Sequence, residues 1–274
     1  MSRYRLIGAC VFVIVGIVVV YAETKEPANG PELIKQLKKD YRIESVALDS
    51  DGNAIVAIVE GDRVPDVNSA ITRLSRTKTL RSLTVTHARI EGKLLSALKN
   101  LRNLRKLCLW DCTLVEKDLA ALKDLTFIEE LDLSGTSLKD VAMVYVKPLT
   151  NLHTLSLDRT KLNGSGFSNL ESLPLRVLHI AITPITDDSL QAIGRIKTLQ
   201  ELDLHDTTVS DEGIKHLCNL TRLVKLVLNK HVTVDGTEAF RKAHSLSRTK
   251  AENDGLLSKK YPPLKIIGGG AKRS

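Results

Sequence analysis

The chain has 274 residues, of which 43% are hydrophobic and only 4% are aromatic. This length and apolar content allow a sizeable core, but the scarcity of rings favours an elongated stack built from Leu, Ile and Val over a deep globular interior. The formal net charge of +8 is modest, and its spread among acidic residues argues against the clustered basic stripe of a nucleic-acid-binding protein.

The N-terminus carries an export signal. Arg3 and Arg5 precede an uncharged run, Leu6–Ala22, which ends before Glu23. As a helix of about 1.5 Å per residue the run reaches about 25 Å, slightly less than a hydrocarbon core of about 30 Å. It is nevertheless longer than the apolar region of an ordinary signal peptide. We expect residues 1–22 to form a single-pass anchor that contacts the membrane through residues 6–22, with the rest of the chain outside the cytoplasm. Cleavage after Ala22, which gives a secreted or periplasmic protein, is the alternative.

Residues 23–53 are interpreted as a linker and an N-terminal cap. Pro31 can begin a helix that continues to Lys39. Two strands are predicted at Ile43–Leu48 and Ala54–Val59, and the Asp51-Gly52 pair between them is a hairpin signal.

The same stretch contains a possible calcium loop. Asp49 to Glu60 places Asp, Asp, Asn and Glu at the first, third, fifth and twelfth positions of such a loop. Ala54 occupies the sixth position, where the sharp turn of a calcium loop needs Gly. The Ile and Val residues that follow fit a strand, so we favour the hairpin.

Residues 54–244 contain an internal repeat. An apolar residue opens each unit at Leu80, Leu104, Ile128, Leu152, Leu175, Leu199 and Leu223, with spacings of 24, 24, 24, 23, 24 and 24. Each unit begins with L-x-x-L-x-L, as in LRKLCL and LQELDL. This alternation predicts a strand with positions four and six buried and positions three, five and seven facing outward. The second half, as in SDEGIKHLCNL, has apolar residues three apart and predicts a short helix.

The units resemble the leucine-rich repeats of exported bacterial proteins, L-x-x-L-x-L-x-x-T-x-(I/V)-(T/S)-D-x-(G/S)-L. The closest matches are LRVLHIAITPITDDSL and LQELDLHDTTVSDEGI. The resemblance implies an α/β fold, a curved leucine-rich-repeat solenoid of about seven to eight 24-residue strand–helix units, here preceded by an N-terminal hydrophobic helix. In this family the ninth position turns the chain inward, and here it holds Cys112, Thr136, Thr160, Thr183 and Thr207. Ala88 and His231 stand there in the outer units.

The C-terminal part is expected to close the stack, because open ends of a solenoid must be capped. Val234–Ala243 predicts a last helix, and the polar stretch Ser245–Asp254 predicts its interruption. The segment GLLSKKYPPLKII resembles a partial closing unit. Residues 245–274 therefore form a partial cap that ends in a loose tail from Gly268 to Ser274.

The outward strand positions predict a partner-binding surface on the concave face. Trp110, the only tryptophan, falls at such a position and is a candidate hot spot, unless its ring merely covers the adjoining strands. The other candidates are polar: Lys106, Glu130, Asp132, Asp158, His179, Glu201, Asp203 and His205. Two of these strands carry a pair of carboxylates each, which favours a basic partner with an exposed apolar group.

Other chemistry receives less support from the residues. His179, Asp203 and His205 lie on adjacent strands and could hold a metal, but solenoid faces are routinely polar, so we predict neither metal nor cofactor. Cys108 and Cys112 lack the second ligand pair of a structural zinc site. The motifs of a serine hydrolase, a phosphate-binding loop and a zinc protease do not occur. We therefore expect no enzyme and no small-molecule substrate.

The sequence thus favours a non-catalytic module that binds a protein or peptide outside the cytoplasmic membrane. A structural envelope component that packs against copies of itself is the alternative. A metal-dependent enzyme receives little weight, and so does an F-box adaptor, because residues 23–53 are too few for an F-box. The identity of the partner does not follow from the sequence.

Overall fold

The computed structural model describes residues 39–41, 46–48, 54–254 and 262–269. The predicted anchor, most of the predicted helix 31–39 and the end of the tail lie outside these ranges. Within the described ranges, no helix combines the length and the apolar character needed to cross a membrane.

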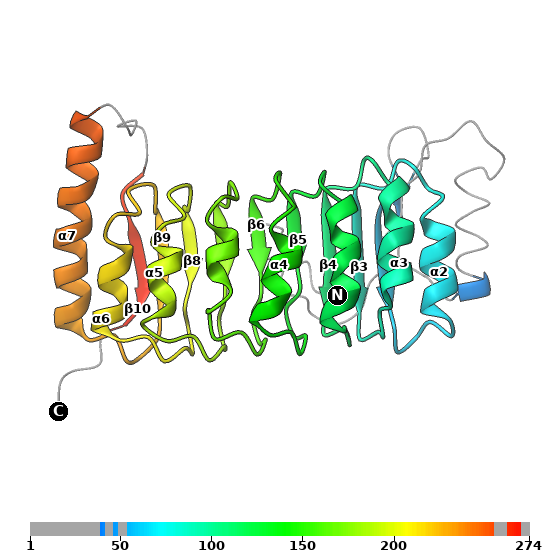
Figure 1. Ribbon diagram of the computed structural model, residues 1–274, viewed down its shortest axis with the longest axis horizontal. Coiled ribbons are helices and arrows are strands. Elements are labelled where there is room, and N and C mark those ends of the chain that lie inside the picture. The colour runs from blue at the N-terminus through cyan, green and yellow to red at the C-terminus, as the bar shows by residue number, and fades with distance from the viewer. Residues whose placement is uncertain (1–38, 42–45, 49–53, 255–261, 270–274) are drawn as a thin grey trace, which may run out of the picture.

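A single sheet of ten strands runs through the described residues, and the strands follow one another in chain order (Figure 1). β1 (Val46–Leu48) and β2 (Ala54–Glu60) pair antiparallel, as the hairpin signal predicts. β2 occupies the sixth to twelfth positions of the possible calcium loop, so these residues form a strand instead. Every later strand pairs parallel with its predecessor. These strands are β3 (Ser82–Thr86), β4 (Lys106–Trp110), β5 (Glu130–Asp132), β6 (Thr154–Ser156), β7 (Val177–His179), β8 (Glu201–Asp203), β9 (Lys225–Leu228) and β10 (Lys265–Gly268).

A row of helices covers one face of the sheet, in front of it in Figure 1. Most are single turns, and several are 3₁₀ helices. They are α2 (Val67–Leu74), α3 (Gly92–Ala97), η1 (Leu98–Asn100), η2 (Glu116–Asp124), η3 (Asp140–Ala142), α4 (Met143–Val146), η4 (Phe167–Leu170), α5 (Ser189–Ile193), α6 (Asp211–Ile214), η5 (Lys215–Leu217) and α7 (Val234–Asn253). The described part from β2 to α7 thus comprises eight strand–helix units, which agrees with the predicted number.

The C-terminal helix is longer than the sequence pattern predicts. α7 continues through the polar stretch that we expected to interrupt it. The reason is a narrow buried stripe on the extended helix, formed by Phe240, His244 and Ala251. His244 is 2% exposed and its Nε2 lies 3.1 Å from the carbonyl oxygen of Leu220. β10 then adds a last parallel strand beside β9.

The repeat phase read from the sequence is confirmed by burial. The residues that open the units, and those at positions four and six, are at most 3% exposed. At position four, Leu107, Leu131 and Leu155 are Cα partners across successive strands. The core is therefore a continuous ladder of leucines that runs between the sheet and the helices.

The corners after strands β3 to β8 share much of their geometry. The ninth-position hydroxyls donate to the carbonyl oxygen of position six, for example Thr160 to Leu157 at 2.7 Å. Cys112 takes the same place, and its Sγ lies 3.4 Å from the Val85 carbonyl oxygen. Position eight has a positive φ in six consecutive units, at His87, Asp111, Gly135, Arg159, Ile182 and Asp206. Only Gly135 has the residue type that this conformation favours.

Carboxylates link each of several units to the next one. Asp187 accepts hydrogen bonds from the amide and the hydroxyl of Ser210, at 2.7 and 2.6 Å. Asp211 accepts the same two bonds from Thr233, at 2.8 and 2.6 Å. A side chain at Gly213 would collide with Asp187 Oδ1, at 2.2 Å from an added Cβ. This close approach explains the glycine in the motif.

Leu155→Ala should lower the free energy of unfolding by about 2–5 kcal/mol, because the side chain is 0% exposed and its removal leaves a cavity. The matched control is Leu246→Ala, since Leu246 is 66% exposed. Chemical denaturation of both variants gives the comparison. Equal midpoints would remove Leu155 from the core.

Asp187→Ala should destabilise the protein by about 1–3 kcal/mol, because it leaves the Ser210 amide and hydroxyl without their acceptor. Asp188→Ala is the control, since the neighbouring carboxylate is exposed and forms no cap hydrogen bond. Thermal melts of the two variants measure the difference. A larger loss in Asp188→Ala would contradict the role given to Asp187.

Candidate functional site

The uncovered face of the sheet presents the outward strand positions in rows. In the row of position three, Lys106 Nζ lies 2.6 Å from Glu130 Oε2, and Lys225 Nζ lies 2.9 Å from Glu201 Oε2. Both pairs join neighbouring strands at Cα-partner positions. The pairs of carboxylates that we expected on β5 and β8 are therefore partly neutralised. Lys225, which sequence reasoning left out, stands 24 residues after Glu201 and could have been found from the repeat spacing.

The remaining carboxylates of this face gather at its centre. Asp132, Asp158 and Asp203 form no ion pair with a lysine or arginine in the described part of the chain. One oxygen of each of these carboxylates accepts a hydrogen bond from a backbone amide. The amide donors are Ser134 to Asp132 at 2.9 Å, Ala181 to Asp158 at 2.7 Å and His205 to Asp203 at 3.0 Å. These bonds fix the orientation of the carboxylates.

Asp158 shows that this centre is electrostatically crowded. Burial raises the pKa of its carboxyl, and the negative charges of Asp203 and Asp132 raise it further. The Ala181 amide and His179 act in the opposite direction. A cationic group placed here would relieve the repulsion among the three carboxylates.

The two histidines of the predicted site have different environments. His205 Nδ1 lies 2.8 Å from Asp203 Oδ1, and its side chain is 41% exposed. His179 is only 7% exposed, so little of it can touch a partner, contrary to our expectation of an outward-facing residue. The described residues contain no group of three or more His, Cys, Asp or Glu side chains arranged to hold a metal.

Trp110 lies at the end of β4 and is half-buried. Its ring makes an edge contact with His87, with centroids 4.9 Å apart and planes at 84°. Its partner residue on β3 is Thr86, which is buried, and Ser134 at the same position of the next unit is also buried. Because both neighbouring side chains are small, part of the indole ring remains exposed to solvent, while its contact with His87 fixes its position.

The cysteines beneath this face are structural. Cys108, expected to point outward, is 4% exposed, and its Sγ lies 3.5 Å from Asp132 Oδ2. Burial raises the pKa of the Cys108 thiol, and burial also raises that of Cys112 to about 12. Thiols of this kind are poor nucleophiles at neutral pH.

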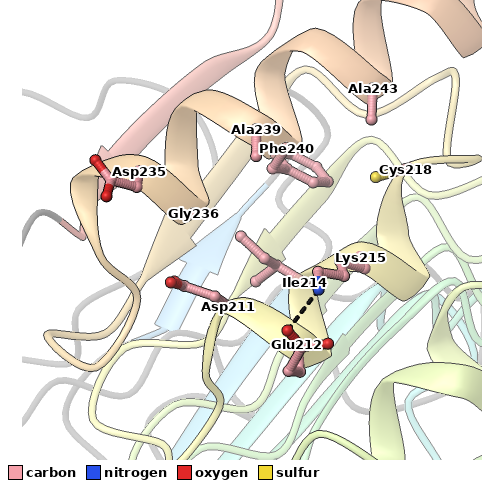
Figure 2. Close-up of a pocket in the computed structure, with 10 residues that line it drawn as sticks. All are labelled: Asp211, Glu212, Ile214, Lys215, Cys218, Asp235, Gly236, Ala239, Phe240 and Ala243. Atoms are coloured by element: carbon pink, nitrogen blue, oxygen red, sulfur yellow. Dashed lines mark hydrogen bonds and ion pairs between the residues drawn. The ribbon is translucent and has the colours of Figure 1, made fainter.

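A separate open groove of about 440 Å³ lies on the helical side, between α6, η5 and α7 (Figure 2). Figure 2 shows Ile214 and Phe240 between the two helices, with the acidic side chains of Asp211 and Glu212 beside them. Glu212 is ion-paired with Lys215. The groove is thus on the face opposite to the predicted site.

Three comparisons with known proteins bear on identity. Residues 196–218 match the family model described as Leucine Rich repeat. A search of curated proteins finds no match. Among solved structures, an internalin from Listeria monocytogenes is 18% identical with a TM-score of 0.48, over 88% of this chain and 75% of the internalin. A plant peptide hormone receptor, RGFR1 in complex with RGF2, is 19% identical with a TM-score of 0.42, over 73% of this chain and 30% of the receptor.

The matched segment is part of one complete structural unit. It covers β8, α6 and η5, and it overlaps the unit LQELDLHDTTVSDEGI that carries the sequence resemblance. The units on either side have the same strand register and the same buried leucines, and the preceding unit also has the same corner geometry. The chain is therefore a leucine-rich-repeat protein.

Proposed function

We propose that this protein is a non-catalytic module that binds a protein or peptide through the uncovered strand face, which we predicted to be the concave side of the solenoid. The observation that carries the proposal is the arrangement of that face. The aromatic side chain of Trp110, in contact with His87, lies on β4, and three oriented carboxylates lie in the units of β5, β6 and β8. Aromatic anchors beside oriented charges are typical of protein-binding surfaces.

The chemistry of the face indicates the kind of partner. The pairs Lys106–Glu130 and Lys225–Glu201 balance their own charges, so the excess negative charge lies at Asp132, Asp158 and Asp203. A partner with a Lys or Arg side chain would be attracted to this centre. An apolar group on the same partner could cover Trp110. We propose a basic protein or peptide with an exposed apolar residue.

The leader supports display of this face outside the cytoplasm. The run Leu6–Ala22 behind Arg3 and Arg5 has the charge order of a single-pass anchor with its basic end inside. The repeats would then stand in the extracytoplasmic space, where they meet partners from outside the cell. Release after cleavage at Ala22 would leave the binding face unchanged.

A second candidate function is self-assembly through the helical face. The observation in its favour is exposed apolar side chains on that face: Val115, Val141 and Val144 are 42%, 57% and 51% exposed. Exposed apolar patches can mark contacts between chains. This candidate predicts that changes on the helical side alter the oligomeric state.

The partner for this test is recovered by crosslinking in the native membrane fraction. Trp110→Ala should weaken its binding by about 2 kcal/mol or more. The reason is the loss of apolar contact area that His87 already holds in place. Calorimetric titration of the purified variants measures the change, and thermal melts check that each variant is folded.

Two further sets of variants complete this comparison. Asp132→Asn with Asp203→Asn removes two central charges but keeps an acceptor oxygen, and should mainly slow association and weaken its salt dependence. The control reverses Lys123 and Lys215, which are exposed on the helical side. If the control abolishes binding while the other variants bind normally, the strand face is not the binding surface.

The anchor is tested by fractionation. After high-salt and carbonate washes the full-length protein should stay in the membrane pellet, because an apolar helix of this length resists extraction. Mass spectrometry of the N-terminus accompanies the assay. A soluble product that begins at Glu23 would show that the leader is cleaved.

A further inference from the structure

One part of the solenoid carries a large excess of positive charge. Residues 67–110 contain ten Lys or Arg residues and a single carboxylate, Glu91, so this segment has a formal charge of 10 − 1 = +9. The whole chain has +8, so all other residues together sum to −1. The even mixing of charge that we expected from the composition is therefore wrong.

The structure places half of these cations on one edge of the sheet. The basic edge is defined here as Arg76, Lys78, Arg81, Lys99 and Arg102. They lie in the segments where helices end and strands β3 and β4 begin, which is the upper edge in Figure 1. The two units are in contact there, since the Asn103 side chain donates to the Lys78 carbonyl oxygen and the Arg105 amide donates to that of Arg81.

The five side chains are available to a partner. All are exposed, and none has an ion pair with a carboxylate in the ranges that the structure describes. The next two cations along the edge, Arg105 and Lys106, are paired with Glu129 and Glu130. The edge thus ends where the carboxylates of the following unit begin.

We propose that the basic edge binds the anionic headgroups of a lipid surface. Clustered Lys and Arg near anionic lipids are attracted electrostatically, by about fivefold in affinity for each cation. The edge belongs to the units that follow the apolar run Leu6–Ala22 most closely in sequence. With that run in the bilayer, the edge is held at a high local concentration beside the lipid.

The composition of the edge disfavours single-stranded nucleic acid as the ligand. Proteins that bind single strands place aromatic side chains among the cations to stack with bases. Trp110 is the only Phe, Trp or Tyr of residues 67–110, and it lies at the opposite end of β4. Phe127 of the next unit is partly buried with Arg102 above it, 5.5 Å from the ring centroid.

This inference uses the anchor proposed above but not the binding by the strand face. The test compares full-length variants on phosphatidylcholine vesicles with and without phosphatidylglycerol, at low and high salt. The measured quantity is the affinity for vesicles that contain phosphatidylglycerol divided by the affinity for vesicles of phosphatidylcholine alone. The leader contributes equally to all variants, so differences in the ratio come from the folded part.

The variant Arg76→Glu, Lys78→Glu, Lys99→Glu should lower the ratio on the order of 100-fold at low salt. The matched control, Lys117→Glu, Lys139→Glu, Lys161→Glu, changes the total charge equally at exposed positions on the opposite edge and should keep most of the ratio. The same three edge positions changed to Gln should give a smaller loss. Melting curves verify the fold of each protein.

Equal losses in both Glu variants would overturn the proposal, because net charge alone would explain them. An unchanged ratio in the edge variant would also overturn it. A duplex oligonucleotide is titrated in parallel. If the edge variant loses affinity for the oligonucleotide but keeps its lipid ratio, nucleic acid is the ligand instead.

Discussion

The structure depends on one constraint: a unit of about 24 residues cannot bury its own leucines. Each short strand contributes two inward side chains, and these are covered only when the strand is paired in parallel register with neighbours on both sides. Equal unit lengths therefore maintain the register, and the same position recurs beside itself along the sheet. Corners, caps and surface rows all follow from this stacking.

The stacking also decides which polar groups can meet. Residues far apart in the chain but equal in unit position become neighbours, as Lys106 and Glu130 do. Residues two apart in one unit can also meet, as Asp203 does with both the amide and the ring of His205. The electrostatics of the strand face are thus determined both along rows across the sheet and within single units. The same holds for the edge, where cations of two adjacent units gather.

The repeat made much of the fold predictable. The phase of the leucines gave the strands, the buried positions and the ninth-position corners, because periodic burial leaves a periodic sequence. The positive φ at position eight had no such signal, since His87, Asp111 and Ile182 share no residue type. The length of α7 was missed because its stripe includes a histidine and an alanine in place of large apolar residues.

The candidate site was predictable only in part. Strand alternation identified Trp110, Asp132 and Asp203 as outward positions, and each is partly exposed. His179 and Cys108 also lie at outward positions of their strands, but both are buried. Exposure at an outward position also depends on the sizes of side chains in both neighbouring units, which alternation within one strand does not contain.

The aspartates that accept backbone amides from another unit all take them from the unit that follows. Asp140, Asp187 and Asp211 each accept hydrogen bonds from the unit that follows in the chain. A chain that emerges from the ribosome N-terminus first would therefore present at its growing end a carboxylate, which water solvates well, while the matching amides arrive with the next unit. Loss of an early unit would instead leave amide donors without acceptors. The asymmetry favours assembly from the N-terminus and makes fraying at the C-terminal end the less costly failure.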